Sequence, residues 1–248
     1  IVAMCGLANL TGFPGRDPIG LGTLHTDFTV PYFAATQVMA ALLQRERTGE
    51  GQYLEIAQYE ASVHLLDTEL VEWMNNGGPV ERRGNYAGWM APHGVYRAAG
   101  EDRWVAVACR GPEDWGALCG VAGLEGLRVL DRFDDVDAVE QILEGWMSER
   151  DRWEGAALLQ AAGVPASAVE DLGDLLGPDE AMADSYRAMA LPAGVTALVQ
   201  EEPILWDGER LPLVRAPMWS EHTYEVLQGE LGLSDEAVAE LAAKNVLF

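Results

Sequence analysis

Basic residues are scarce in this 248-residue sequence: sixteen lysines and arginines stand against forty aspartates and glutamates, giving a formal net charge of −24. A surface this acidic repels nucleic-acid phosphates and anionic lipid headgroups. Hydrophobic runs are short as well, and none approaches the ~20 residues that a membrane-spanning helix needs. The sequence therefore predicts a protein with no nucleic-acid partner and no membrane partner.

Cysteine and histidine are also rare. Three cysteines, an odd number, are too scattered for a disulfide framework, which favours a reducing, cytoplasmic compartment. The histidines and cysteines do not cluster at the spacing of metal ligands, so we expect no metal site. The residues concerned are Cys5, Cys109, Cys119, His25, His64, His93 and His222.

The remaining composition is typical of a folded globular protein, with 49% hydrophobic and 23% charged residues. The length allows one large domain or two modest ones. The first residues include no initiator methionine and no basic flank of a signal peptide. We therefore expect that residues upstream are missing, cleaved or carried on another chain.

Hydrophobic periodicity predicts helices separated by a few strands. A glycine- and proline-rich loop at 11–23 precedes a helix over about 28–48, with Thr26 or Asp27 as its N-cap and Gly49 after its last turn. The other expected elements are a strand at 52–57, a helix at 58–75, a hairpin of 93–97 with 103–109, helices at 113–122, 135–148 and 151–162, a strand at 163–169, a broken helix at 170–183, a β-rich portion at 193–212, and helices at 221–229 and 234–243.

These elements predict an α/β protein in three segments. Residues 79–192 form a small α+β domain that is inserted between two parts of a larger domain, residues 1–78 and residues 193–248. The flanking parts contain too few strands to complete a sheet, so we expect a partner segment to supply the rest. The tryptophans Trp104, Trp115, Trp146 and Trp153 fall at apolar positions and are expected in the core.

Asp27 is the first candidate for chemistry. It follows the glycines Gly20 and Gly22 and precedes an apolar helix. A helix N-terminus stabilises an ionised carboxylate, and such a carboxylate can attack a carbonyl as a nucleophile. The alternative is an ordinary N-cap, a common role of aspartate.

A second candidate site lies at Arg82, Arg83 and Asn85, followed by His93. Two arginines in an acidic chain can pair with phosphate or carboxylate groups, and the neighbouring glycines allow a ligand to approach the backbone. The alternatives are a solvated loop for the arginines and a structural role for His93. The Gly-x-Gly at 20–22 lacks the remaining pattern of a dinucleotide-binding motif.

Several motifs together resemble family III CoA-transferases, the formyl-CoA and carnitine CoA-transferase type that also includes α-methylacyl-CoA racemases. They are HTDF at 25–28, RERTGEGQYLEIAQ at 45–58, RRGN at 82–85, APHGVY at 91–96, GVPA at 163–166, RAP at 215–217 and EHT at 221–223. The motifs occur in the order of that family and extend over nearly the whole chain. The match is to the C-terminal part of the longer family chain.

The resemblance implies a specific chemistry. The catalytic aspartate of the family precedes the Gln of the Thr-Gly-x-Gly-Gln run by 25 residues, which is Asp27 here when counted from Gln52. Its carboxylate would transfer CoA between carboxylic acids through mixed anhydrides and an aspartyl-CoA thioester. Coenzyme A and acyl-CoA would be substrates, with no prosthetic group. Arg82, Arg83, Asn85 and His93 would bind the CoA part.

The resemblance also implies an assembly: a Rossmann-like large domain and a dimer of interlocked chains, or a heteromer with the absent N-terminal segment. Two other functions stay open. In an acyl-CoA racemase, Asp27 would transfer protons together with a histidine located upstream of Ile1. The chain could also be a non-catalytic subunit or fragment of a heteromeric transferase. The acyl group and the acceptor acid are not identified by the sequence.

Overall fold

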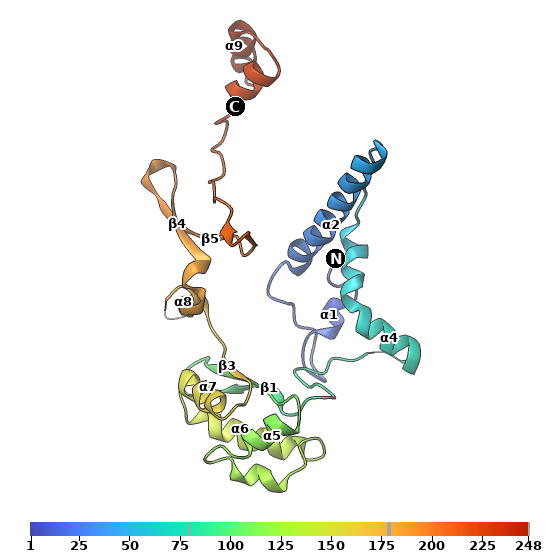
Figure 1. Ribbon diagram of the computed structural model, residues 1–248, viewed down its shortest axis with the longest axis vertical. Coiled ribbons are helices and arrows are strands. Elements are labelled where there is room, and N and C mark those ends of the chain that lie inside the picture. The colour runs from blue at the N-terminus through green and yellow to red at the C-terminus, as the bar shows by residue number, and fades with distance from the viewer. Residues whose placement is uncertain (79, 178–179, 248) are drawn as a thin grey trace. The chain divides into compact units, whose positions relative to one another are not determined.

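The computed structural model of the protein describes residues 1–78, 80–177 and 180–247 (Figure 1). The chain divides into two compact units, residues 1–169 and residues 170–248. Both helices and strands are present, as a mixed α/β chain requires. The division into three segments at residues 78/79 and 192/193 stays a prediction.

The first unit begins with helices. They are α1 (Leu7–Leu10), α2 (His25–Thr48), α3 (Gln58–Val63), a 3₁₀ turn (His64–Leu66) and α4 (Asp67–Asn76). The long helix α2 packs against α3. Gly49 ends α2 in a left-handed conformation (φ 78°), and its N–H donates to the Arg45 carbonyl at 2.7 Å, which confirms the expected end of this helix.

Two expectations for this region are wrong. Helix α2 begins at His25, so neither Thr26 nor Asp27 is its N-cap; the N-cap residue is Leu24, which makes no side-chain capping bond. Residues 52–57 are not a strand, because no described part of the chain pairs with them. A β-strand needs a neighbouring strand to which its backbone can hydrogen-bond. Alternation of apolar and polar residues within one segment does not show whether such a neighbour exists.

The rest of the first unit is a three-stranded antiparallel sheet in the order β1-β2-β3, covered by helices. Its elements are β1 (His93–Arg97), β2 (Trp104–Ala108), α5 (Pro112–Leu118), a 3₁₀ turn (Glu125–Val129), α6 (Val136–Ser148), α7 (Arg152–Ala161) and β3 (Ala166–Ala168). The hairpin is confirmed, with His93 opposite Ala108 and Arg97 opposite Trp104.

Buried and partly exposed residues alternate along the strands, so the sheet has one buried face and one more open face. Tyr96, Val105 and Val107 are buried against helices α6 and α7, together with Leu143 and Leu159. On the opposite face, Trp104, Ala106 and Ala108 of β2 are only partly buried. Among the tryptophans, Trp146 is in the core as expected, whereas Trp153 is 41% exposed and the expectation for it is wrong.

The second unit contains short elements. They are α8 (Leu172–Leu175), a 3₁₀ turn (Glu180–Ser185), β4 (Tyr186–Ala190), a 3₁₀ turn (Pro192–Gly194), β5 (Thr196–Gln200), β6 (Leu205–Trp206), β7 (Glu209–Arg210), a π-helix (Glu225–Glu230) and α9 (Asp235–Ala243). Strand β4 pairs with β5 and was not expected from the sequence. The expected helix break at 177–178 lies partly outside the described residues.

Two kinds of feature are absent from the described residues. No helix there is both long enough and apolar enough to cross a membrane. Within the same residues, no group of three or more histidine, cysteine, aspartate or glutamate side chains is arranged to hold a metal ion. The three cysteines are buried and form no disulfide.

Candidate functional site

Asp27 is the third residue of α2, so its carboxylate lies in the first turn, where the backbone N–H groups and the helix dipole favour negative charge. The residue is exposed. Proline at position 31 has no N–H, and the Asp27 carbonyl therefore lacks its usual helical partner. The sequence indicated Asp27 as a candidate because it stands between a glycine-rich loop and an apolar helix.

The Asp27 side chain borders a hollow of about 410 Å³. Its other lining residues are Val30, Pro31, Ala34, Ile56 and Gln58. One wall is thus the apolar side of α2, and the other is the segment that leads into α3. A carboxylate at the edge of an apolar hollow is suited to a ligand that has both a polar group and an apolar part.

Gln58 is the residue of this site that sequence reasoning missed. Its Nε2 donates a hydrogen bond to Asp27 Oδ1, and Nε2 also lies 3.3 Å from the hydroxyl of Thr26. Among the described residues, Gln58 is the side-chain partner that the structure gives the Asp27 carboxylate. No local sequence pattern indicated this contact, which joins residues 31 positions apart.

Arg82 connects its own segment to helix α1 and to the loop that follows this helix. Its guanidinium donates to the Asn9 carbonyl at 2.8 Å and to the Arg16 carbonyl at 2.9 Å. The N–H of Gly84 donates to the Gly12 carbonyl at 3.0 Å in the same region. These contacts fix the glycine-rich loop near Arg82, which gives this arginine a structural role that the sequence did not indicate.

Arg83 differs from its neighbour. Its guanidinium pairs with Glu72 of α4 at 2.6 Å, and 46% of the Arg83 side chain is exposed. Arg82 and Arg83 both border a further hollow of about 450 Å³. Of the two, Arg83 presents the more accessible positive charge.

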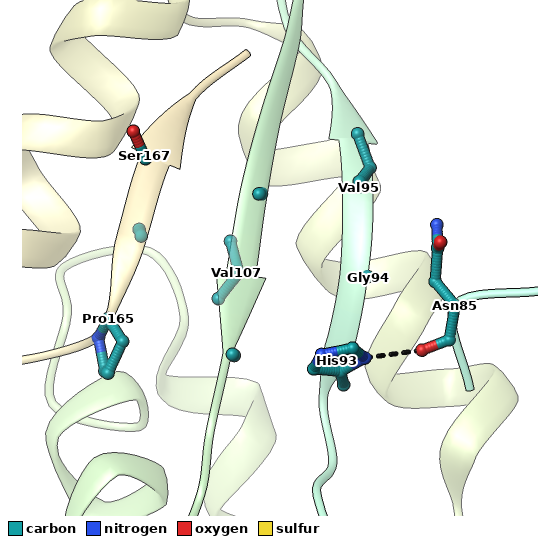
Figure 2. Close-up of a pocket in the computed structure, with 10 residues that line it drawn as sticks. Asn85, His93, Gly94, Val95, Val107, Pro165 and Ser167 are labelled. Atoms are coloured by element: carbon teal, nitrogen blue, oxygen red, sulfur yellow. Dashed lines mark hydrogen bonds between the residues drawn. The ribbon is translucent and has the colours of Figure 1, made fainter. Parts of the chain in front are cut away.

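Asn85 and His93 are brought together at a hollow of about 410 Å³ on the open face of the sheet. Figure 2 shows the His93 ring directed at Asn85, and the Nδ1 atom lies 2.5 Å from the Asn85 carbonyl oxygen. The remaining lining residues, mostly small or apolar, are Gly94, Val95, Ala106, Val107, Ala108, Pro165, Ala166 and Ser167. In the described structure, this hollow and that of Asp27 share no lining residue.

A partly buried polar pair supports the strand that carries His93. The Tyr96 hydroxyl donates to Glu140 Oε1 of α6 at 3.0 Å. Burial, reinforced by Glu144 and Asp137, raises the pKa of Glu140, although the Tyr96 hydrogen bond opposes this. A Cβ at Gly94 would lie 2.9 Å from the Tyr96 hydroxyl, so glycine is needed at that position for the pair to form.

Comparisons with known proteins agree on one family. The model of the family described as "CoA-transferase family III" matches residues 1–223. The chain is 30% identical to a succinyl-CoA–L-malate CoA-transferase beta subunit of Chloroflexus aurantiacus, over 99% of this chain and 63% of that protein. It is 26% identical to a formyl-CoA:oxalate CoA-transferase of Streptomyces coelicolor, over 99% of this chain and 65% of that protein.

A solved structure gives the same result for the fold. The crystal structure of a CAIB/BAIF family protein from Brucella suis matches with a TM-score of 0.79 at 25% identity, over 93% of this chain and 61% of that one. The chain therefore spans a little under two thirds of the length of the curated relatives and of the structure to which it is similar.

Proposed function

Because this chain belongs to CoA-transferase family III, we propose that it transfers coenzyme A from an acyl-CoA to a carboxylic acid, with Asp27 as the nucleophile. The observation that carries the proposal is the exposed Asp27 carboxylate in the first turn of α2, at an apolar hollow and bonded by Gln58. An exposed carboxylate at the edge of such a hollow is accessible to a thioester carbonyl, which it can attack as a nucleophile.

The proposed reaction has two symmetrical halves. One oxygen of Asp27 bonds to the acyl carbon, and the C–S bond breaks with its electron pair leaving on the CoA thiolate. The thiolate then attacks Cγ of Asp27, which forms a thioester and releases the first acid as its carboxylate. The incoming carboxylate attacks Cγ and expels the thiolate, and the thiolate attacks the new acyl carbon and frees Asp27. These steps require no prosthetic group.

We assign the binding of acyl-CoA partly to the second candidate region. Arg83, with Arg82 beside it, offers positive charge to the CoA phosphates in a chain whose net charge is −24. Asn85 and His93 offer polar atoms at the edge of a hollow with small, apolar walls. The buried free cysteines fit the proposed cytoplasmic location, where thiols stay reduced.

The proposed assembly follows the resemblance. Residues 1–78 and 193–248 would belong to a Rossmann-like large domain, and residues 79–192 to the small domain. The active form would be an interlocked homodimer, or a heteromer with a second subunit. The many exposed apolar side chains of α2, such as Phe28 and Tyr32, support a partner at this helix.

Replacement of Asp27 tests the function. In the complete natural protein with any co-purifying subunit, we expect CoA transfer from acyl-CoAs to free acids, and Asp27→Ala should lower it at least a thousandfold. The matched control is Asp17→Ala, in an exposed loop. Survival of activity in Asp27→Ala would indicate a non-catalytic scaffold. Exchange of the α-proton of the substrate in deuterated water, without CoA transfer, would indicate the racemase.

A further inference from the structure

The contact between Gln58 and Asp27 has a chemical consequence that depends on which atom faces the carboxylate. The Gln58 carboxamide has one donor end and one acceptor end, and only the Nε2 end can bond an ionised carboxylate. Nε2 lies against Asp27 Oδ1 and is 3.3 Å from Thr26 Oγ1. Each of its two N–H groups therefore has an acceptor.

The surroundings hold this amide in place. Thr26 is only 4% exposed, so its hydroxyl is a fixed partner. Gln58 is the first residue of α3, and its own carbonyl accepts a hydrogen bond from the fully buried Ser62 hydroxyl at 2.7 Å. A donor held by such contacts loses little freedom when charge develops next to it.

We propose that the Gln58 amide stabilises the oxyanion that forms on Asp27 when Cγ is attacked, an assignment that rests on the proposed function. With Gln58 on Oδ1, Oδ2 is the oxygen that bonds to the acyl carbon. In the mixed anhydride and in the thioester, Oδ1 is then the carbonyl oxygen. Attack of the thiolate on Cγ moves the electron pair of this carbonyl onto Oδ1, where the Gln58 N–H meets it. Collapse restores the carbonyl, breaks the bond from Cγ to Oδ2 and releases the acid as its carboxylate.

The assignment separates the steps of the reaction. In the first step, the negative charge develops on the carbonyl oxygen of the substrate, away from Gln58. In the two attacks on Cγ, by thiolate and by the incoming acid, it develops on Oδ1. Gln58 therefore accelerates the formation and the breakdown of the aspartyl-CoA thioester and leaves the initial release of CoA nearly unaffected.

A rapid-quench experiment on the complete natural protein tests this. Gln58→Leu removes the donor, and we expect it to slow formation of the CoA thioester at Asp27 by about 10²–10³-fold, the usual effect of losing one oxyanion donor. The rate of initial CoA release and the KM for acyl-CoA should stay within a few-fold of wild type. Gln141→Leu, the same change at an exposed position of α6, should behave as wild type.

Gln58→Glu provides a readout that a purely structural role would not change. A carboxyl group of the same size donates a hydrogen bond only when it is protonated. We therefore expect the thioester-forming rate of Gln58→Glu, relative to wild type, to increase as the pH falls from about 8 to about 5. A pH-independent ratio would overturn the proposal, as would a wild-type rate in Gln58→Leu. Absence of any thioester in the wild-type protein would instead refute the proposed function itself.

Discussion

At the scale of single residues, two adjacent arginines have different surroundings and should have different functions. Arg82 is held by the backbone carbonyls of Asn9 and Arg16, whereas Arg83 pairs with Glu72 at a partly exposed position. An exposed ion pair contributes little to stability because water and salt screen it. In the proposed CoA site, Arg83 would therefore exchange Glu72 for a phosphate at small cost, whereas Arg82 would have to give up its backbone contacts.

Charge reversal at Arg83 tests this difference. Arg83→Glu should weaken CoA binding by about tenfold at low ionic strength, and the loss should shrink as salt is added. Lys244→Glu is a matched control, since it also reverses a cation paired with an exposed glutamate, Glu240. Isothermal titration with CoA measures both. Equal affinities of wild type and Arg83→Glu at low salt would remove Arg83 from the CoA site.

The sequence indicated Asp27 as a candidate but did not indicate its contact with Gln58. The signal for Asp27 is local, because a carboxylate between glycines and an apolar helix has a recognisable context. Gln58 lies 31 residues further along, and its contact with Asp27 exists only because α3 packs on α2. The prediction that Asp27 is an N-cap is wrong, because the helix begins two residues earlier, at His25, without a side-chain cap.

At the scale of elements, helix α6 carries a half-buried carboxyl group, that of Glu140, whose ionisation should affect stability. Burial raises the pKa of Glu140, with Glu144 and Asp137 adding to the effect. Its folded pKa is therefore above its unfolded value. The stabilisation that the protonated carboxyl contributes is fully present below the unfolded pKa and is lost as the pH rises through the folded one.

Glu140→Gln should remove this dependence. Glutamine retains an acceptor for the Tyr96 hydroxyl but carries no charge, so the melting temperature should rise at about pH 8 and change much less at about pH 5. Glu149→Gln, at the exposed end of α6, is the control. Thermal unfolding by circular dichroism at both pH values measures the effect. A larger gain at the lower pH would contradict the reasoning.

Some elements could be predicted from the sequence and others could not, depending on whether the contacts that stabilise them are local. The hairpin of β1 and β2 and helices α6 and α7 were predicted because their partners are close in sequence or their apolar faces are clear. The segment 52–57 has the composition of a strand but no partner in the described chain. Strand β4 was not predicted, because the residue pattern of this short segment did not reveal that it forms a hairpin with β5.

At the scale of the whole molecule, helix α2 exposes an apolar stripe. Phe28, Tyr32, Ala35, Met39 and Leu42 recur at four- and three-residue spacing, and exposure reaches 66% for Phe28 and 69% for Tyr32. Monomeric soluble proteins rarely expose a contiguous stripe of this kind. The stripe accords with the proposed assembly, in which a second chain covers this helix.

Light scattering after size-exclusion chromatography tests the assembly. The complete natural protein should elute as a dimer or heteromer, and Tyr32→Asp combined with Met39→Asp should shift it toward the mass of a single chain, because burial of two charges is costly. Gln37→Asp, on the opposite side of α2, is the control and should leave the mass unchanged. A double variant with the mass of the wild type would place the interface elsewhere.

The most direct test of the central claim is the chemical state of Asp27 during turnover. The complete natural protein is incubated with an acyl-CoA, trapped with hydroxylamine or borohydride, digested, and mapped by mass spectrometry. The account predicts a modification that depends on acyl-CoA, is located at Asp27, and is absent from Asp27→Ala. Transfer of CoA between acids with Asp27 unmodified, or with the adduct on another residue, would contradict it.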